Sequence, residues 1–379
     1  MKIGIISSEF HPLNAAASAR AGSWVSYFRE FGHEVTVFTS SNALPEKRFL
    51  VRSWFSTPDN RASIIRRLAQ EVLLGVDLAF RMIFNARRTQ MNLITSPPFF
   101  MAVFCAFACR LCRIPYVFDV RDRYPNALFE LGLLARDKWA GRLLQNLESL
   151  LYCSSAFVST VTKGLASDIK AFCPGRELFL SRNGYDERIF LERLLRKKKF
   201  SSFTVVYHGR LGRFYDQDTL CEVILILEKL QPRIRFLMIG DLKGFQAKRT
   251  WRTVEFMDEM PLGELAPVLT KCHLGICLLK ETDAMKKALP AKAFDFWGAG
   301  LPIIASPEGE LAETIEKNGS GIAFKENDSD RIAQSIIKLH GDHELLEGLR
   351  GSVLSGRSQF GRRKQAKRLL EKLEKEMIA

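Results

Sequence analysis

The sequence predicts an α/β protein that carries a parallel β-sheet in each of two domains. Two observations support this fold class. Residues 2–7 and 35–39 are short apolar runs joined by a helical stretch, which is the βαβ pattern of a parallel sheet. The same pattern starts again at residues 203–208, followed by a helix from residue 218 and a strand at 235–240. A length of 379 residues is ordinary for two domains.

The domain boundaries follow from this repeat. We assign residues 1–188 to the first domain, residues 189–359 to the second, and residues 360–379 to a final helix. The charged stretch 185–200 shows no core pattern and is interpreted as the connection. Further strands are expected at 93–98, 116–120, 156–162, 178–183, 254–257, 274–279, 301–305 and 322–324, and further helices at 100–112, 135–152, 163–172, 265–271, 292–297 and 329–340.

Composition is that of a soluble globular protein, with 47% hydrophobic and 26% charged residues. The chain has no run of about 18 apolar residues. Its first ten residues read as a strand and not as a signal peptide, so we expect a cytoplasmic protein. Three of the eight cysteines, Cys105, Cys109 and Cys112, lie in an apolar segment without histidine. Core positions are therefore expected for them, and not a zinc site.

The net charge of +14 indicates an anionic partner, such as nucleic acid, a phosphate-bearing substrate or a membrane face. Residues 47–88 concentrate this charge, with nine Lys and Arg against three acids, interleaved with aromatic and aliphatic residues. This pattern favours a basic amphipathic helix on an anionic membrane. An ordinary helix packed on the sheet is the alternative. Nucleic acid is less favoured, because no recognition motif accompanies the charge.

Two places in the first domain could face a ligand. The loop after the first strand lacks G-x-G-x-x-G but contains His11 and Arg20. A plain turn residue is the favoured interpretation of His11. Asp122 follows the strand at 116–120, so it lies at the ligand edge of a parallel sheet. Its two flanking arginines should keep it strongly ionised; a surface ion pair is the alternative.

Two stretches of the second domain could bind phosphate and sugar. The loop at 209–213, G-R-L-G-R, precedes a helix, and its arginines suit a diphosphate, although Gly-x-x-Gly alone is weak evidence. The stretch 288–307 forms a short helix and a buried strand, and it contains Lys292 and Asp295. Asp295 could accept hydrogen bonds from two sugar hydroxyls and Lys292 could meet phosphate. A helix-capping aspartate beside a solvated lysine is an equal alternative.

Together these motifs resemble GT-B glycosyltransferases of family four, especially the bacterial branch that builds O-antigen, capsule and exopolysaccharide. The resemblance rests on T-S-P-P (95–98), V-R-D-R-Y-P-N (120–126), S-R-N-G-Y-D (181–186), G-R-L-G-R (209–213) and L-P-A-K-A-F-D-F-W-G-A-G-L-P-I-I-A-S (289–306). It implies two Rossmann-like domains facing a cleft, with the last helix crossing back to the first domain. It also implies retention of anomeric configuration and no metal or other cofactor.

The resemblance implies a role for particular residues. The second acid of the family's Glu-x7-Glu motif, which holds the ribose, matches Asp295. The remaining donor-binding positions match Gly209, Arg210, Gly212, Arg213 and Lys292 around the diphosphate, and Phe256 and Met257 near the base. Asp122 matches the position beside the reacting centre, and Ala16, Ala17 and Arg20 match the acceptor site.

The sequence departs from the family pattern at three places. Lys287 stands where the first acid of the Glu-x7-Glu motif belongs, which leaves the donor sugar open. Residues 15–17 are alanines in place of a glycine pair. Asp216 stands where a lysine is expected after Arg210, and Arg213 could replace its charge.

The expected function is transfer of a sugar from a nucleoside diphosphate, UDP being favoured, to a lipid-linked saccharide in bacterial surface polysaccharide synthesis. The expected location is cytoplasmic and peripheral on the inner face of the cell membrane, reached through residues 47–88. Two alternatives stay open. One is a non-catalytic nucleotide-sugar-binding scaffold. The other is a GT-B-type nucleotide-sugar 2-epimerase, which would need a histidine and several acids in the cleft, and the histidines of this sequence are not placed for it.

Overall fold

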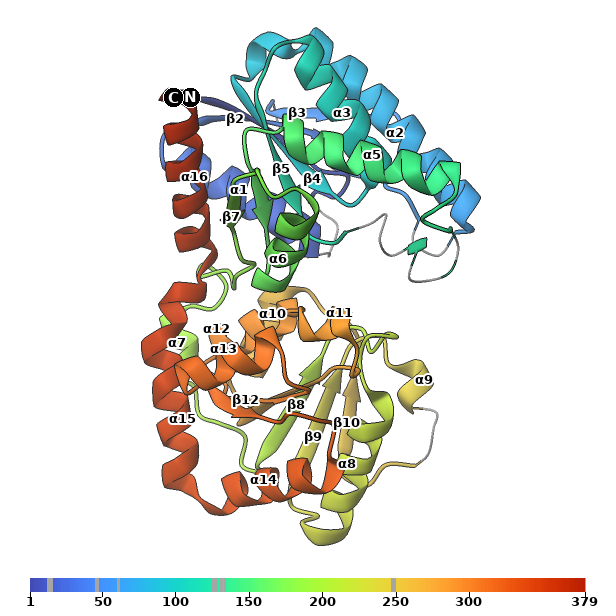
Figure 1. Ribbon diagram of the computed structural model, residues 1–379. Helices are drawn as coiled ribbons and strands as arrows, with labels where there is room; N and C mark the ends of the chain where they lie inside the picture. The colour runs from blue at the N-terminus through green and yellow to red at the C-terminus, as the bar shows by residue number, and fades with distance from the viewer. Residues whose placement is uncertain are drawn as a thin grey trace. The chain divides into compact units, whose positions relative to one another are not determined.

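The computed structural model describes the chain except residues 12–15, 45–47, 60–61, 124–127, 130–131, 133, 247–249 and 379, and the side chains of residues 16, 193 and 243. It divides into two compact units (Figure 1). Unit 1 comprises Met1–Arg182 and Gln365–Ala379, and unit 2 comprises Asn183–Lys364. Among the described residues, no helix has both the length and the hydropathy needed to span a bilayer.

Unit 1 is built on a seven-stranded parallel sheet of order β3-β2-β1-β4-β5-β6-β7. Its strands are short and rich in buried apolar residues, as expected for a sheet that is covered on both faces. They are β1 (Lys2–Ile6), β2 (Glu34–Thr39), β3 (Leu50–Arg52), β4 (Met91–Ser96), β5 (Tyr116–Val120), β6 (Val158–Thr160) and β7 (Leu178–Leu180).

Two layers of helices cover the unit 1 sheet. Successive strand residues point to opposite faces, so the strands feed two separate cores. One face carries α2 (Ile64–Phe84), α3 (Phe99–Leu111), α5 (Trp139–Ser154) and α6 (Lys163–Phe172), with η1 (Ala86–Arg88) after α2. The other face carries α1 (Ala16–Glu30) and the part of α16 (Arg362–Ile378) that belongs to unit 1.

Unit 2 repeats the plan with a six-stranded parallel sheet of order β10-β9-β8-β11-β12-β13. Its strands are β8 (Thr204–His208), β9 (Arg235–Ile239), β10 (Val254–Met257), β11 (Leu274–Leu278), β12 (Ile303–Ser306) and β13 (Gly321–Ala323). Its helices are α7 (Glu192–Leu195), α8 (Gln217–Leu230), α9 (Lys243–Gln246), α10 (Leu262–Leu269), α11 (Asp283–Lys286), α12 (Ala291–Gly298), α13 (Glu310–Asn318), α14 (Ser329–Gly341), α15 (His343–Gly356) and η2 (Arg357–Phe360).

The predicted α/β class and the two parallel sheets are confirmed. One expectation is wrong: the stretch 185–200 was interpreted as a connection without a core pattern. Three of its residues, Tyr185, Phe190 and Leu194, are buried in the core that α12 and α13 share in unit 2. The charged residues between these three positions hide the spacing, because the segment is too short and irregular to show a helical period.

Candidate functional site

The carboxyl edge of the unit 2 sheet is the first place to look for a ligand, because parallel strands end there in loops and helix starts. β8 and β9 are followed by Gly209 and Gly240, which have positive φ angles of 89° and 136°. A side chain at Gly240 would place its Cβ 2.6 Å from the carbonyl oxygen of Gly209. The two loops therefore approach each other backbone to backbone, which only glycine permits.

The loop after Gly209 presents two cations. Arg210 and Arg213 are exposed, and in the described part of the chain neither forms an ion pair. The hydroxyl of Tyr207 donates to the carbonyl of Arg210 at 3.0 Å, which fixes the start of the loop. Gly212 lies between them and is partly exposed. Free guanidinium groups beside a glycine turn can bind a diphosphate in the forked geometry that arginine favours.

Lys292, in the first turn of α12, is buried and not solvated, so the solvated alternative is wrong. Its ammonium nitrogen lies 3.5 Å from the ring centre of Tyr207 and 3.7 Å from that of Tyr215. It has no hydrogen-bond partner among the described residues. Burial lowers the pKa of Lys292 to about 7, while Cys277 and Asp295 oppose the shift. A buried cation held only by ring faces would gain strongly from an anion.

Asp295 lies one turn further along α12 and does not cap it, since the helix is capped at Pro290. Its carboxylate is largely buried, with 14% of the side chain exposed, and accepts no hydrogen bond from a described residue. Burial raises the pKa of Asp295 to about 7, opposed by the charges of Arg362 and Lys292. A buried carboxylate that accepts no hydrogen bond from the described part of the protein, at the carboxyl edge of the sheet, is suited to accept hydrogen bonds from two sugar hydroxyls.

His208 ends β8 and was missed by the sequence analysis. Its Nε2 atom lies 3.7 Å from Oδ2 of Asp295 and has no hydrogen-bond partner among the described residues. Its ring meets Phe296 edge to face at 5.1 Å. Burial lowers the pKa of His208 to about 3, with Lys292 adding to the shift, so the imidazole is neutral. The sequence feature that could have pointed to His208 is its place as a polar residue at the end of an apolar strand, directly before the glycine loop.

Phe256 and Met257 end the edge strand β10 at this same side of the sheet, and both are partly buried. The backbone nitrogen of Gly240 donates to the carbonyl of Met257 at 3.0 Å. This bond ties the end of β10 to the glycine pair, so the predicted base-binding residues and the predicted diphosphate loop lie on one edge. Their contact with a base stays a prediction.

The structure explains one departure from the family pattern. Asp216 caps α8: its carboxylate accepts hydrogen bonds from the backbone nitrogens of Asp218 and Thr219, at 3.2 and 3.1 Å. Asn327 donates to the same carboxylate at 2.7 Å. Asp216 is therefore a structural residue, and the buried amine of this region is that of Lys292. Lys287 follows α11 with an exposed side chain, and nothing in the structure explains its presence.

In unit 1, Asp122 follows β5 at the carboxyl edge, as predicted, with an exposed side chain. The expected strong ionisation between two arginines is wrong. Arg123 donates two hydrogen bonds to Glu148, at 2.9 and 3.0 Å, and Arg121 donates to the carbonyl of Pro97 at 2.9 Å. Although the side chain touches solvent, crowding by protein raises the pKa of Asp122, and the charge of Arg121 opposes this shift. A carboxylate with a raised pKa is a better proton acceptor than an aspartate of ordinary pKa.

The predicted acceptor-binding residues lie at the start of α1. Arg20 is buried and donates to both carboxylate oxygens of Asp119, at 2.8 and 3.1 Å. It also donates to the carbonyls of Ser181 and Arg182, at 2.8 and 3.1 Å. Ala17 is buried. Ala16 begins the helix, and the side chain of Ala16 and residue 15 lie outside the described residues. The acceptor contacts stay predictions, and Arg20 is engaged within its own unit.

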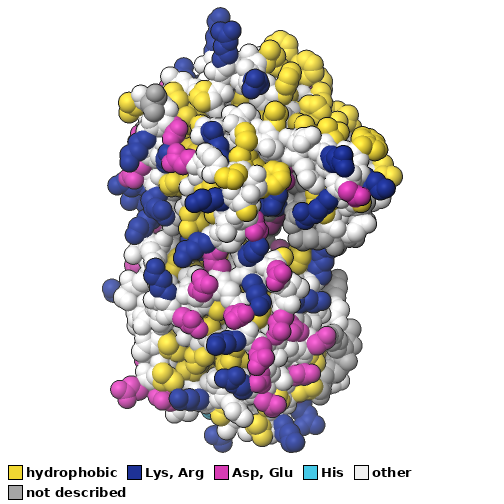
Figure 2. Space-filling view, in the orientation of Figure 1, with side chains coloured by type: hydrophobic (Ala, Val, Ile, Leu, Met, Phe, Trp, Pro, Cys, Tyr) yellow, Lys and Arg dark blue, Asp and Glu magenta, His cyan; other side chains and the backbone are white. Residues whose placement is uncertain are grey.

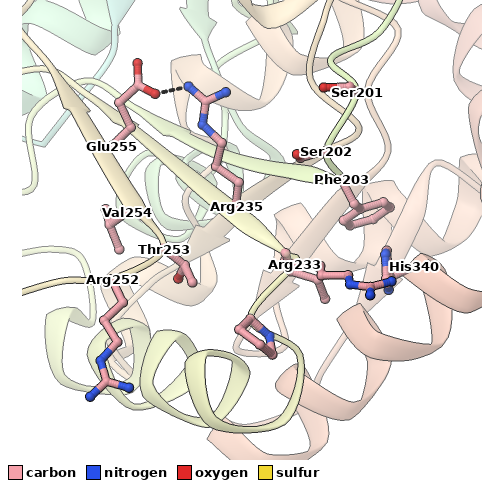
Figure 3. A pocket seen from close by; sticks show the side chains of 12 residues that line it. Ser201, Ser202, Phe203, Arg233, Arg235, Arg252, Thr253, Val254, Glu255 and His340 are labelled. Atoms are coloured by element: carbon pink, nitrogen blue, oxygen red, sulfur yellow. Dashed lines mark hydrogen bonds and ion pairs between the residues drawn. The ribbon is translucent and has the colours of Figure 1, made fainter.

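A separate pocket of about 530 Å³ opens at the amino edge of the unit 2 sheet (Figure 3). Segments 201–203, 232–235 and 252–255 line it together with His340, and Arg235 is paired there with Glu255. None of the predicted site residues lines this pocket, so it is not the candidate site.

The described residues contain no cluster of three or more His, Cys, Asp or Glu side chains that could hold a metal ion. Cys105 and Cys109 are buried in the core under α3, as predicted, and Cys112 is partly buried.

Comparison with protein families assigns both units. The family described as glycosyl transferases group 1 matches residues 202–342, and the glycosyl transferase 4-like domain matches residues 16–178. Among curated proteins, the chain is 22% identical over 351 residues to the probable glycosyltransferase WbjE of Pseudomonas aeruginosa, covering 86% of each chain. It is 28% identical over 137 residues to chitobiosyldiphosphodolichol beta-mannosyltransferase of Candida glabrata, covering 34% of this chain and 29% of that one.

Solved structures share the fold. Anabaena HepE in complex with UDP and glucose superposes with a TM-score of 0.70 at 14% identity, covering 99% of this chain and 100% of HepE. WaaG, a glycosyltransferase involved in lipopolysaccharide biosynthesis, superposes with a TM-score of 0.67 at 12% identity, covering 97% of this chain and 98% of WaaG. These likenesses concern the fold of both units.

Proposed function

Because this chain is a glycosyltransferase of the GT-B fold and of family-four-like type, we propose that it transfers a sugar from a nucleoside-diphosphate sugar to a lipid-linked saccharide. UDP is the proposed nucleotide, which agrees with the UDP bound to HepE. The proposed reaction retains anomeric configuration and uses no metal or other cofactor. The rest of the proposal follows from the carboxyl edges of the two sheets.

One observation carries the donor site: the buried ammonium of Lys292 has no hydrogen-bond partner among the described residues. A diphosphate would supply one, and Arg210 and Arg213 would neutralise its outer oxygens. Asp295 would accept hydrogen bonds from the ribose hydroxyls, with neutral His208 beside it. Phe256 would contact the base. These groups offer cations, a hydrogen-bond acceptor and an aromatic side chain on one edge of the sheet, and a nucleoside diphosphate can use all three.

In the proposed reaction the bond between the anomeric carbon and the β-phosphate oxygen breaks, and the acceptor oxygen forms the new bond. Negative charge develops on the departing diphosphate, and fixed cations stabilise it more than they stabilise the ground state. The sugar becomes oxocarbenium-like and is attacked on the face that the leaving group departs from. The acceptor hydroxyl loses its proton either to the departing phosphate, in which case Asp122 only orients that hydroxyl, or to Asp122 itself.

The acceptor is proposed to be a saccharide linked to a polyprenyl diphosphate, or a lipopolysaccharide core. The dolichol-linked acceptor in the name of the yeast relative supports a lipid-linked acceptor, and the involvement of WaaG in lipopolysaccharide biosynthesis supports a role in surface polysaccharide synthesis. The proposed location is the inner face of the cell membrane, with residues 47–88 as the contact. Part of that segment belongs to the core, since Leu74, Leu78 and Met82 are buried against the sheet.

Donor binding and turnover test the proposal. UDP-glucose, UDP-galactose and UDP-N-acetylglucosamine should raise the melting temperature, because a ligand that binds only the folded state stabilises it. Radiolabelled sugar should then pass to lipid extracts, and Asp122→Asn should lose at least about 100-fold in turnover with donor binding retained. Absence of any melting shift with all uridine and other nucleoside-diphosphate sugars would overturn the donor assignment.

A further inference from the structure

The exposed large apolar side chains of unit 1 gather on the outer side of three neighbouring helices. Hydrophobic side chains follow the upper right of the molecule in Figure 2, over α2, α3 and α5 in Figure 1. We call this surface the three-helix face. Its exposed apolar members are Ile64, Ile65, Leu73, Phe80 and Phe84 in α2, Phe107 and Leu111 in α3, and Trp139, Leu143 and Leu150 in α5.

α2 is apolar on two opposite sides. At about 100° per residue, Leu74, Leu78 and Met82 fall on one side, and they are buried against the sheet. Phe80 and Phe84 fall on the other side, where 58% and 84% of their surfaces are exposed. A helix on the surface of a soluble domain normally carries polar residues there. The outer side of α2 therefore requires a separate explanation.

Helices α2 and α3 pack closely against each other. Gly75 allows α2 to approach α3, since a Cβ there would lie 2.8 Å from Cα of Met101. Buried Glu71 accepts a hydrogen bond from the backbone nitrogen of Phe100 at 3.4 Å and one from Arg67 at 3.2 Å. Burial raises the pKa of Glu71, and the charge of Arg67 opposes the shift. The outer sides of α2 and α3 therefore lie next to each other as parts of one surface.

Charge on the three-helix face is positive. The acids of α2 and α5, namely Glu71, Asp77 and Glu148, are each held in an ion pair with an arginine. No acid occurs in α3. Exposed arginines on or beside the face that form no ion pair in the described part of the chain are Arg66, Arg87, Arg88, Arg110 and Arg142.

We propose that the three-helix face docks on an anionic lipid surface. Its aromatic side chains enter the headgroup region and its unpaired arginines contact lipid phosphates. The charge favours lipid over a second copy of this chain, because a symmetric contact would set these arginines against each other. The proposal extends beyond residues 47–88, since Phe107 and Trp139 lie outside that segment. It rests on the proposed function in one respect, because the lipid-linked acceptor proposed there is the reason for this protein to bind a membrane.

The three-helix face reaches the carboxyl edge of the unit 1 sheet, so docking also positions that edge. α2 and α5 each lead into a parallel strand, so they run opposite to the strands and begin at the carboxyl edge of the sheet. Ile65 and Trp139, at the starts of these helices, are exposed by 82% and 79%. Asp122 lies on the same edge, after β5. Docking therefore holds the proposed acceptor edge of unit 1 near the headgroups that carry a lipid-linked saccharide.

Flotation with vesicles tests the proposal. Wild-type protein should float at low salt with vesicles of phosphatidylcholine and phosphatidylglycerol, and at least about tenfold less with phosphatidylcholine alone. Phe107→Ser with Trp139→Ser should lower binding by at least about tenfold, from the apolar area lost. Arg66→Gln with Arg110→Gln should lower it roughly 30-fold, and the loss should shrink at high salt. Leu230→Ser and Arg331→Gln, exposed positions of unit 2, are the matched controls and should bind like wild type.

Three outcomes would overturn the proposal. In the first, wild-type protein does not float with anionic vesicles. In the second, the two double variants of the three-helix face float as well as the control variants. In the third, wild-type protein forms a stable dimer that dissociates in the Phe107→Ser, Trp139→Ser variant. Melting temperatures near that of wild type establish that the variants fold. The melting shift with UDP-glucose is measured on the same proteins. Its loss together with normal flotation would count against the donor assignment and not against docking, and the reverse result would count against docking alone.

Discussion

The carboxyl edges of the two sheets have the same architecture but treat charge in opposite ways. In unit 1, Arg20 is neutralised by Asp119 through two hydrogen bonds, and Arg123 is neutralised by Glu148. In unit 2, Lys292 has no hydrogen-bond partner among the described residues, and Asp295 accepts no hydrogen bond from them, with its Oδ2 3.7 Å from Nε2 of His208. These two arginines of the unit 1 edge are thus paired by residues of their own unit, whereas Lys292 and Asp295 of the unit 2 edge have no such partners in the part of the chain that the structure describes.

This difference separates charges that hold a fold from charges that wait for a ligand. A buried ion pair with its hydrogen bonds made stabilises one arrangement of the chain and offers nothing further to a ligand. A buried cation and a buried acceptor without partners destabilise the free protein, and a ligand that supplies both partners recovers that free energy. The comparison predicts large stability effects in unit 1 and large binding effects in unit 2.

The largest expected effect is on the stability of unit 1. Arg20→Leu leaves the carboxylate of Asp119 buried without its cation, and the free energy of unfolding should fall by about 3 to 5 kcal/mol. Chemical denaturation measures this. The double variant Arg20→Leu, Asp119→Leu is the control and should be less destabilised than the single variant. A single variant as stable as wild type but slower in transfer would instead support the acceptor contact predicted for Arg20.

The next effect is on donor binding in unit 2. Lys292→Met removes the cation from between Tyr207 and Tyr215, and the affinity for UDP-glucose should fall about 100-fold, because a charged hydrogen-bond donor to the diphosphate is lost. Calorimetry measures the affinity. Stability should not fall, since methionine fills the same space without a buried charge. Lys338→Met, at an exposed position of α14, is the control. Unchanged affinity in the Lys292 variant would contradict the donor site.

A smaller effect is expected on the pH dependence of donor binding. The pKa of Lys292 is lowered to about 7 and that of Asp295 is raised to about 7, both by burial. The anion needs the protonated amine, so affinity falls as pH rises above 7. The ribose needs the carboxylate, so affinity also falls as pH drops below 7. The affinity for UDP-glucose should therefore peak near pH 7 and fall roughly threefold one pH unit away on either side, because binding needs the protonated amine and the ionised carboxylate together.

Asp295→Asn sharpens this test because its amide oxygen still accepts a hydrogen bond but does not titrate. The decrease on the acid side should vanish, and the decrease on the alkaline side should remain. A profile that is flat from pH 6 to pH 8 in wild type would show that the ligand does not engage these two groups.

The sequence predicted the strands and the polar edge of unit 2 because both have local signatures. Apolar runs of about five residues mark buried parallel strands, and the stretch 288–307 places Lys292 and Asp295 on one short helix. His208 has no such signature: a single polar residue at the end of a strand forms no pattern. Its meaning comes from its distance to Asp295, which depends on how β8 and α12 pack.

The ion pairs of unit 1 could not be predicted for a related reason. Arg20 and Asp119 are separated by 99 positions, and sequence alone gives no pairing between them. Asp119 lies inside the apolar run Tyr-Val-Phe-Asp-Val, and a buried carboxylate needs a partner, but the sequence analysis did not single it out. The flanking arginines, Arg121 and Arg123, looked like the partners of Asp122. In the structure, Arg121 donates to the carbonyl of Pro97 and Arg123 donates to the carboxylate of Glu148.

The last effect concerns a charge of unit 2 that belongs to the fold. Asp216 caps α8 and also accepts hydrogen bonds from the hydroxyl of Thr219 at 2.8 Å and from Asn327 at 2.7 Å. Asp216→Ala should lower the free energy of unfolding by about 1 to 2 kcal/mol, with the affinity for UDP-glucose unchanged. Asp328→Ala is the matched control, because Asp328 caps α14 by accepting from the backbone nitrogen of Arg331 at 3.0 Å. It should cost about 1 kcal/mol. If Asp216→Ala instead binds UDP-glucose more weakly at unchanged stability, Asp216 contributes to donor binding and not to the fold. The distinction between structural charges and ligand-binding charges would then not hold for Asp216 in unit 2.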